Sequence, residues 1–180
     1  NNGGLSASSL LYANCKSAFD AHGRLYVADG ANNRVLIFDN PSNDTKADTV
    51  IGQINFTSSG PACSATRLNG PNGIAVDAAG RLYVAEVGNH RVLVFENAAN
   101  DGTADTVIGQ PNFTTSTVNN GGLTWGLNTA YGIGGVDGGG RLYIADYANH
   151  RVLLHQNILV DTSVDTVFGQ PDPTTATIKL

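Results

Sequence analysis

The segment RLYVADGANNRVLIF, which begins at Arg24, indicates the architecture of the chain because it occurs three times. It returns as RLYVAEVGNHRVLVF from Arg81 and as RLYIADYANHRVLLH from Arg141. Eight of the fifteen positions are identical in all copies, and a second block, DTVIGQ or DTVFGQ, follows each copy at the same distance. The copies advance by 57 and then 60 residues, so the chain consists of three long tandem repeats.

Each repeat is predicted to form four β-strands. In the middle copy, residues 74–78 are a short apolar run, followed by a turn that begins at Asp77 and ends at Gly80. Asp at the first position and Gly at the fourth are typical of a type I turn. Residues 81–86 and 90–96 then provide the second and third strands, and the outer strand lies around 106–108.

The central strands are apolar on both faces. Leu82 and Val84 lie on one side of their strand, and Tyr83 and Ala85 on the other, so both sides need a cover. Four-stranded units of this kind bury themselves by stacking face to face around an axis, which is the architecture of a β-propeller. A parallel β-helix has much shorter repeats, and no segment has the 3.6-residue period of a helical solenoid.

The expected fold class is therefore all-β, a β-propeller segment of three four-stranded blades. Small residues in the innermost strand, namely Ala18, Ala75 and Gly135, suit the crowding of blades near the axis. We expect one repeat domain over residues 1–180, divided into blade 1 at 1–57, blade 2 at 58–117 and blade 3 at 118–180.

The middle copy resembles the NHL repeat, whose pattern runs Pro-x-Gly-Ile-Ala-Val-Asp, then Gly, a Tyr-Val-Ala-Asp-like strand and Asn-His-Arg-Val. The third copy has Ala130 in place of the Pro, and the first copy has Asn-Cys-Lys at 14–16 in place of Pro-Asn-Gly. Residues 104–113 resemble the Ala-Asp-x-Val-x-Gly-Gln-Pro-x-Phe segment of bacterial extracellular NHL arrays. The residues that match the repeat are Pro71, 73–77, Gly80, 83–86 and 89–92.

This resemblance implies a propeller without implying one activity, because the fold serves lyases, lactonase-like enzymes, receptor sensor domains and RNA-binding modules. The net charge of −5, with no run of Lys or Arg longer than one residue, argues against a nucleic-acid partner. No apolar stretch approaches the roughly 20 residues of a membrane span. The sequence contains no nucleophile elbow, phosphate loop or His-Glu-x-x-His motif.

An acidic residue ends the second strand of each repeat, and an Arg opens the third strand after four intervening residues. The spacing places each carboxylate opposite its Arg across a hairpin, where such a pair contributes about 0.2–1 kcal/mol. Recurrence in every blade indicates a scaffold role, since an active site would occur once. The pairs are Asp29 with Arg34, Glu86 with Arg91, and Asp146 with Arg151.

Asp101 and Asp105 lie in a polar loop before the outer strand of the middle repeat, and their oxygens make calcium the candidate metal. The loop lacks the acidic spacing of an EF-hand, and Asx-turn capping explains the same residues. No cofactor is required. His90 and His150 share a repeat position that Asn33 fills in the first copy, and we interpret them as structural.

Two aromatic residues of the third copy are candidates for ligand binding. Trp125 and Tyr131 lie in the stretch 121–132, which leads to an innermost strand. Loops at that end of a propeller commonly form its binding face, and exposed aromatic rings suit a protein or carbohydrate ligand. The alternative is that Trp125 fills a gap between blades. His155 replaces an apolar aromatic residue, as is common in a terminal repeat.

Cys15 and Cys63 both lie in stretches that lead to innermost strands, and a disulfide between them would close a loop of about 48 residues. Such a bond would indicate an oxidising compartment. Asn43, Asn55 and Asn112 begin Asn-x-Thr sequons, which matter only in a glycosylating cell. The sequence has no Met, so it does not start at an initiator. We expect a secreted or cell-surface protein of bacterial type.

The function expected first is a protein- or ligand-interaction module, or a structural assembly module. The alternative is a propeller hydrolase or lyase, lactonase-like or amidating-lyase-like, with a divalent metal near the axis. Three blades cannot close a ring, because propellers have about four blades or more, and both end faces would stay uncovered. We therefore expect a homo-oligomer, favouring a two-chain ring of six blades, or further blades from a longer chain.

Overall fold

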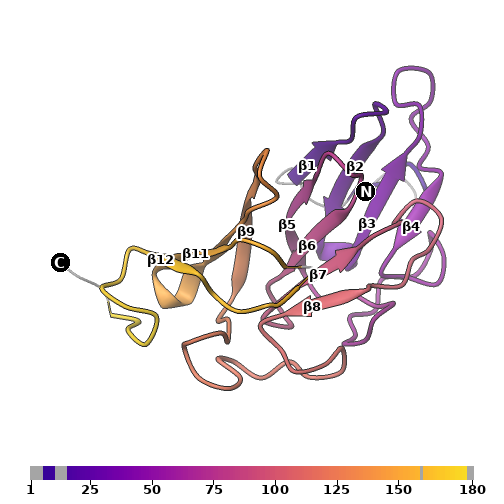
Figure 1. The fold of residues 1–180 in the computed structure, drawn as a ribbon. Helices are drawn as coiled ribbons and strands as arrows, with labels where there is room; N and C mark the ends of the chain where they lie inside the picture. Colours follow the sequence, from indigo (N-terminus) through magenta and orange to yellow (C-terminus); the bar gives the residue numbers. More distant parts are fainter. Residues whose placement is uncertain (1–5, 11–15, 159, 178–180) are drawn as a thin grey trace.

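Within residues 6–10, 16–158 and 160–177, which the computed structural model describes, the chain forms three four-stranded antiparallel sheets (Figure 1). Each sheet contains consecutive strands in chain order, which confirms the expected three blades. Blade 1 consists of β1 (Lys16–Phe19), β2 (Leu25–Asp29), β3 (Arg34–Phe38) and β4 (Thr49–Ile51). Blade 2 consists of β5 (Pro71–Val76), β6 (Leu82–Glu86), β7 (Arg91–Phe95) and β8 (Thr106–Ile108). Blade 3 consists of β9 (Ala130–Val136), β10 (Leu142–Asp146), β11 (Arg151–His155) and β12 (Thr166–Phe168).

The innermost strand of blade 2 begins earlier than the predicted 74–78. Pro71 pairs with Glu86, and a register shift separates this pair from the next one at Ile74. A bulge of this kind interrupts the apolar alternation, so the sequence pattern alone does not reveal the first part of the strand. None of the helices in the described ranges has the length and hydropathy needed to cross a membrane.

The turn between the first and second strands of each blade depends on an Asp. In blade 2, Asp77 Oδ1 accepts the backbone N–H groups of Ala79 and Arg81, each at 2.9 Å. The Gly80 N–H donates to the Asp77 carbonyl at 3.0 Å, and Gly80 has a φ of +84°, which favours glycine. Burial opposes ionisation, but the bonds from Arg81 hold the pKa of Asp77 below its usual range. The predicted Asp–Gly turn is therefore present, with its carboxylate ionised at neutral pH.

Blade 2 is covered on both faces, as the alternation along β6 predicts. Leu82 and Val84 belong to the core that blade 2 shares with blade 1. Tyr83 and Ala85 belong to the core that it shares with blade 3. All four side chains are at most 1% exposed, so apolar burial on both sides holds the three blades in one stack.

The blades approach one another most closely at their innermost strands. A Cβ atom on Gly73 of β5 would lie 2.5 Å from the Gly132 Cα of β9, far inside contact distance. The sequence predicts this crowding at Ala18, Ala75 and Gly135, whereas the tight backbone contact lies at Gly73 and Gly132. Any side chain at Gly73 would force the two blades apart.

The two end faces of the stack differ, which corrects the expectation that both are uncovered. On blade 1, Val27 and Leu36 are only 6% and 0% exposed and belong to a cluster against which Phe56 packs. On blade 3, Val152 is 36% exposed and Phe168 is 48% exposed. The open apolar sheet face of the described chain is therefore the outer face of blade 3.

Candidate functional site

An ion pair lies between the second and third strands of every blade. In each case the two residues are register partners across the hairpin. Their side chains have no exposed surface at all. The pairs join Arg34 Nε to Asp29 Oδ2 at 2.8 Å, Arg151 Nε to Asp146 Oδ2 at 2.7 Å, and Arg91 Nε to Glu86 Oε2.

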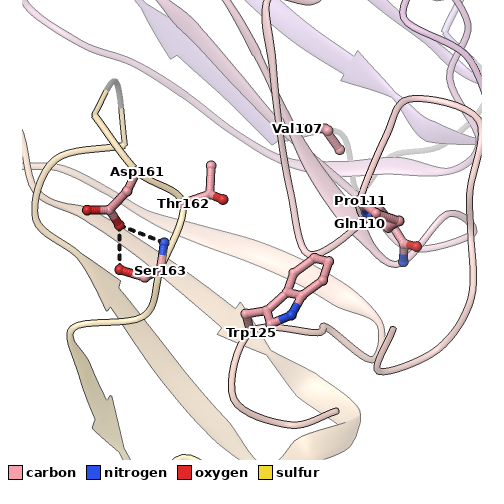
Figure 2. A pocket seen from close by; sticks show the side chains of 7 residues that line it. All are labelled: Val107, Gln110, Pro111, Trp125, Asp161, Thr162 and Ser163. Carbon is pink, nitrogen blue, oxygen red and sulfur yellow. Dashed lines mark hydrogen bonds between the residues drawn. The ribbon is translucent and has the colours of Figure 1, made fainter. Parts of the chain in front are cut away.

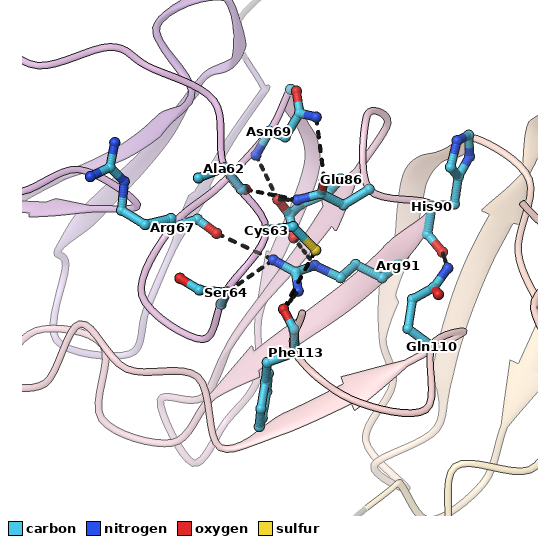
Figure 3. Close-up of polar contacts among 12 residues, drawn as sticks. Ala62, Cys63, Ser64, Arg67, Asn69, Glu86, His90, Arg91, Gln110 and Phe113 are labelled. Carbon is cyan, nitrogen blue, oxygen red and sulfur yellow. Dashed lines mark hydrogen bonds and ion pairs between the residues drawn. The ribbon is translucent and has the colours of Figure 1, made fainter. Parts of the chain in front are cut away.

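Each of these arginines also joins two loops, as Figure 3 shows for Arg91. Its Nη1 donates to the Phe113 carbonyl at 2.5 Å, in the loop after the outer strand. Its Nη2 donates to the Ser64 carbonyl at 3.0 Å, in the loop before the innermost strand. Its Nη2 also donates to the Arg67 carbonyl at 3.2 Å, and the arginines of blades 1 and 3 bind carbonyls of the same two loops. One guanidinium therefore fixes both loops at the same end of its blade.

Complete burial changes the energetics expected for these pairs. The figure of about 0.2–1 kcal/mol applies to ordinary cross-strand pairs, whereas removal of one member of a buried pair costs about 3–5 kcal/mol. Burial raises the pKa of Glu86, and the Arg91 guanidinium with the Asn69 backbone amide opposes that rise. The pairs are deeply embedded parts of the framework and are out of reach of a ligand.

A second repeated contact connects each blade with the next one. The Asn33 Oδ1 of blade 1 accepts the Gly70 backbone N–H at 2.8 Å. At the same repeat position in blade 2, His90 Nδ1 accepts the Thr129 backbone N–H at 3.0 Å. His150 has the same left-handed backbone, with a φ of 54°, but lies exposed at the end of the stack. We call this hydrogen bond from a backbone N–H of the next blade to Asn33 or His90 the inter-blade latch. The sequence could have revealed it, because Asn and His side chains both provide a hydrogen-bond acceptor at that position.

The outer face of blade 3 combines His150 with aromatic and aliphatic side chains. A hollow of about 430 Å³ there is lined by Tyr131, Tyr147, Val152 and Phe168, among others. The rings of Tyr131 and Tyr147 lie 5.3 Å apart, centroid to centroid, and are tilted by 35°. Tyr131 is 40% exposed and Tyr147 is 65% exposed. This face presents apolar surface and the His150 imidazole to solvent.

Trp125 lies elsewhere, so the two aromatic candidates do not form one site. Its indole lines a separate cavity of about 430 Å³ between blades 2 and 3, with Gln110 and Pro111 on its own side (Figure 2). Residues 161–163 of blade 3 line the other side. A Cβ atom at Gly121 would lie 2.5 Å from the indole Nε1 of Trp125. The absence of a side chain at Gly121 therefore allows the indole to pack against the loop.

The two candidate calcium ligands, Asp101 and Asp105, each accept a hydrogen bond from a different backbone N–H group. Asp101 Oδ1 accepts the Thr103 backbone N–H at 2.9 Å, and Asp105 Oδ2 accepts the Glu96 backbone N–H at 2.8 Å. The Asp101 bond is that of an Asx-turn, as expected, whereas the Asp105 bond joins two residues that are nine apart in the sequence. Among the residues that the structure describes, no group of three or more His, Cys, Asp or Glu side chains is placed to hold a metal.

Cys15 lies outside the described residues, so the structure does not test the disulfide. Cys63 has its thiol within 3.2 Å of the Thr115 carbonyl and 3.5 Å of the Phe113 carbonyl. Burial raises the pKa of the Cys63 thiol. Cys63 is thus half-buried beside the loop that Arg91 fixes, and it has no disulfide partner among the residues that the structure describes.

His155 occupies a core position in blade 3. Its side chain is 1% exposed, and neither ring nitrogen has a hydrogen-bond partner among the described residues. Burial lowers the pKa of His155, while the backbone of Ser163 and the carboxylates of Asp165 and Asp161 oppose that change. The neutral imidazole therefore replaces a phenyl ring in the core at the expense of two unsatisfied nitrogens.

The comparisons with known proteins agree with this architecture. Residues 68–95 match the model of the NHL repeat family, and the other two copies carry the same strand sequences. A comparison with curated protein sequences gives no match.

Solved structures of propeller proteins share the fold at low identity. The chain is similar to a nidogen/laminin complex, with 18% identity and a TM-score of 0.51 over 84% of this chain and 45% of that one. It is similar to an inactive virginiamycin B lyase from Staphylococcus aureus with quinupristin, with 14% identity and a TM-score of 0.53 over 93% and 46%. A luciferin-regenerating enzyme gives 16% identity and 0.51 over 88% and 47%. The chain therefore spans less than half the length of each of these structures.

Proposed function

We propose that this chain, an NHL-type three-blade segment of a β-propeller, is an assembly and interaction module whose outer blade 3 face binds another blade of its own kind. The single observation that carries the proposal is the repeated inter-blade latch. Asn33 and His90 each bind a backbone N–H of the following blade, and His150 holds the same position at an open face.

The apolar side chains around this latch support the same interpretation. Val92 and Ile108 of blade 2 are 0% exposed because blade 3 covers them. Their counterparts on blade 3, Val152 and Phe168, are 36% and 48% exposed. A strand face of this composition gains about 25 cal/mol for each Å² of apolar surface that a neighbour covers, so a further blade would stabilise it.

A second copy of this chain is the occupant that we propose. Its blade 1 carries Leu25, Val27 and Leu36, which stand where Leu142, Ile144 and Leu153 cover blade 2. Because Val27 and Leu36 are already only 6% and 0% exposed, most of the apolar surface that the contact would bury belongs to blade 3. Two chains joined through two such contacts, related by a two-fold axis, would form a closed ring of six blades. The extracellular or cell-surface setting belongs to the same proposal.

Phe56 does not obstruct this docking, although it packs on the outer cluster of blade 1. Its counterpart in blade 2, Phe113, packs against the core that blade 2 shares with blade 1. A phenyl ring at this position is therefore compatible with a neighbouring blade in this fold.

An enzymatic function is the alternative, because the lyase and the luciferin-regenerating enzyme share the fold. Their identity to this chain is at most 16%, and at that level the fold does not transfer an activity. No observation among the described residues favours catalysis over assembly, so we do not propose a reaction.

Light scattering at low micromolar concentration tests the proposal. We expect a monodisperse species of twice the chain mass of 18.7 kDa. Val152→Glu, on the open face, should give a folded monomer. Val160→Glu adds the same charge at a 76% exposed position that does not line the hollow, and should leave the pair intact.

Three outcomes would count against this assembly. A stable, folded wild-type species of 18.7 kDa would show that the blade 3 face does not recruit a second copy. Equal dissociation by Val160→Glu would show that the contact lies elsewhere. A polydisperse series of larger masses would refute the closed ring and indicate open head-to-tail stacking.

A further inference from the structure

The Trp125 cavity lies at a junction that occurs twice in the chain, once between blades 1 and 2 and once between blades 2 and 3. At the first junction a side chain fills the corresponding place. Arg67 Nη2 donates to Gln53 Oε1 at 3.3 Å and to the Gly60 carbonyl at 3.1 Å. Gln53 Nε2 donates to that same carbonyl at 3.1 Å. At the first junction, the Arg67 guanidinium therefore binds the Gln53 amide oxygen and the Gly60 carbonyl, and the Gln53 amide nitrogen binds the same carbonyl.

At the second junction the residue in the place of Arg67 is Gly126. The Arg67 carbonyl accepts Arg91 Nη2 at 3.2 Å, and the Gly126 carbonyl accepts Arg151 Nη2 at 3.0 Å. These two arginines hold the same position in their blades. The third repeat therefore keeps the backbone contact and lacks the guanidinium.

The residues that follow support this equivalence. Leu68 and Leu127 each pack on a glycine just beyond an outer strand. A Cβ at Gly52 would lie 2.4 Å from the Leu68 side chain, and one at Gly109 would lie 2.7 Å from that of Leu127. The loops that contain Leu68 and Leu127 thus pack in the same way at their junctions. They differ in the residue before the Leu, which is Arg67 beside Gln53 at the first junction and Gly126 at the second.

The missing guanidinium leaves an unused acceptor at the second junction. Gln110 Nε2 donates to the Thr117 carbonyl at 2.8 Å and to the His90 carbonyl at 3.1 Å, as Gln53 does in blade 1. Gln110 is 3% exposed, and its Oε1 has no hydrogen-bond partner among the described residues. A buried amide oxygen without a donor is costly, so this site favours a ligand that donates hydrogen bonds.

We propose that this cavity binds the guanidinium group of an arginine side chain presented by a partner polypeptide. The guanidinium would donate to Gln110 Oε1, as Arg67 donates to Gln53 Oε1 at the first junction. The Trp125 indole provides an aromatic surface for the cation, and the Asp161 carboxylate lines the same cavity with the opposite charge. The cavity of about 430 Å³ has room for the side chain.

This site is separate from the outer face of blade 3, so the inference goes beyond the proposed assembly and does not depend on it. None of the residues that line the Trp125 cavity lines the blade 3 hollow. The overall charge of −5 also favours the approach of a cationic segment.

Fluorescence provides a direct test, because Trp125 is the only Trp in the chain. The wild-type protein is titrated with Nα-acetyl-arginine amide and with Nα-acetyl-citrulline amide, whose urea group is neutral and of nearly the same shape. We expect saturable binding of the arginine compound with a Kd of about 1 mM. The citrulline compound should bind about tenfold more weakly, since it lacks the charge.

Two variants locate the binding in this cavity. Asp161→Asn should weaken arginine binding about threefold at low salt and keep the turn, because an amide oxygen can still accept the Ser163 N–H. Asp101→Asn makes the same change in the equivalent turn of blade 2 and should have no effect. Trp125→Leu, followed by calorimetry, should weaken binding about tenfold.

Several results would overturn the inference. Equal affinity for the citrulline compound, a linear response without saturation up to about 50 mM, or equal effects of Asp161→Asn and Asp101→Asn would each do so. Saturable binding of methyl glucoside without binding of arginine would assign the cavity to carbohydrate instead. Light scattering on the same samples separates this result from the assembly, because loss of arginine binding at unchanged mass refutes only the cavity proposal.

Discussion

His90 of blade 2 accepts the backbone N–H of Thr129 of blade 3 on its Nδ1, at 3.0 Å. This bond crosses the boundary between two blades and requires a neutral imidazole on that nitrogen. Asn33 makes the same bond to Gly70, so an amide and an imidazole are interchangeable acceptors at this position. The contact explains why a position filled by Asn in one repeat and His in the others belongs to the blade framework.

The latch predicts opposite results for two substitutions of His90. His90→Ala should lower the free energy of unfolding by about 1–2 kcal/mol, because a backbone N–H loses its acceptor. His90→Asn should retain most of the stability, since Asn33 already performs this task at a φ of 53°. Urea denaturation of the two variants measures the difference. Equal losses for both would show that the acceptor does not matter.

The same bond should weaken in mild acid. Burial lowers the pKa of His90 in the folded state, with Asp146 opposing the change. A depressed folded pKa means that its contribution to stability is present above the unfolded value of about 6.5 and is lost as the pH falls through the folded value. Wild-type stability should therefore drop more than that of His90→Asn as the pH falls below about 6.5. Parallel pH curves would contradict this prediction.

The buried Arg pairs should behave as framework. Arg91→Ala is expected to lower the free energy of unfolding by about 3–5 kcal/mol, because it leaves Glu86 buried without its counter-ion. Arg91→Lys should not restore the loss, since an ammonium cannot reach the loops that the guanidinium joins. Thermal unfolding measures both. Arg141→Ala, in a pair whose Arg side chain is 50% exposed, is the control and should have little effect. An unchanged melting temperature with lost ligand binding would reverse the assignment.

Replacing His155 with Phe should stabilise the chain. The first two repeats carry Phe38 and Phe95 there, so the phenyl ring fits the slot. Removing two unsatisfied ring nitrogens should add about 1–3 kcal/mol. Burial lowers the pKa of His155, so the benefit should grow as the pH falls below about 6.5. Phe95→His in blade 2 is the reverse control and should destabilise. Loss of stability in His155→Phe would mean that the imidazole has a partner in solution.

A disulfide between Cys15 and Cys63 remains a prediction. It would contribute roughly 4 kcal/mol through a closed loop of about 48 residues. Thiol labelling of denatured, non-reduced protein should find no free thiol. Without the disulfide, Cys63 should be slow to alkylate in the native state, because burial raises its pKa. Two free thiols per denatured chain would refute the bond and remove much of the argument for an oxidising compartment.

The candidate site was only partly accessible from the sequence. Trp125 could be identified as an aromatic residue in a loop, but its neighbours on the cavity wall, Gln110 and Asp161, come from other parts of two blades. Tyr131 is six residues from Trp125 in sequence and nevertheless lines a different hollow. Sequence proximity does not report which surface a side chain reaches, because Trp125 lies in the loop before β9 and Tyr131 lies in β9 itself.

The amino-acid sequence alone was enough to predict the three blades, their four-stranded order, the Asp–Gly turns and the pairing of Glu86 with Arg91. These features depend on local spacing and on alternation of period two, which a repeat displays three times over. The complete burial of the ion pairs and the difference between the two end faces became apparent only in the packed chain. The same holds for Gln110 Oε1, which has no donor among the described residues. Those properties depend on which surfaces the neighbouring blade and its loops cover, and burial of this kind is fixed by packing between distant parts of the chain.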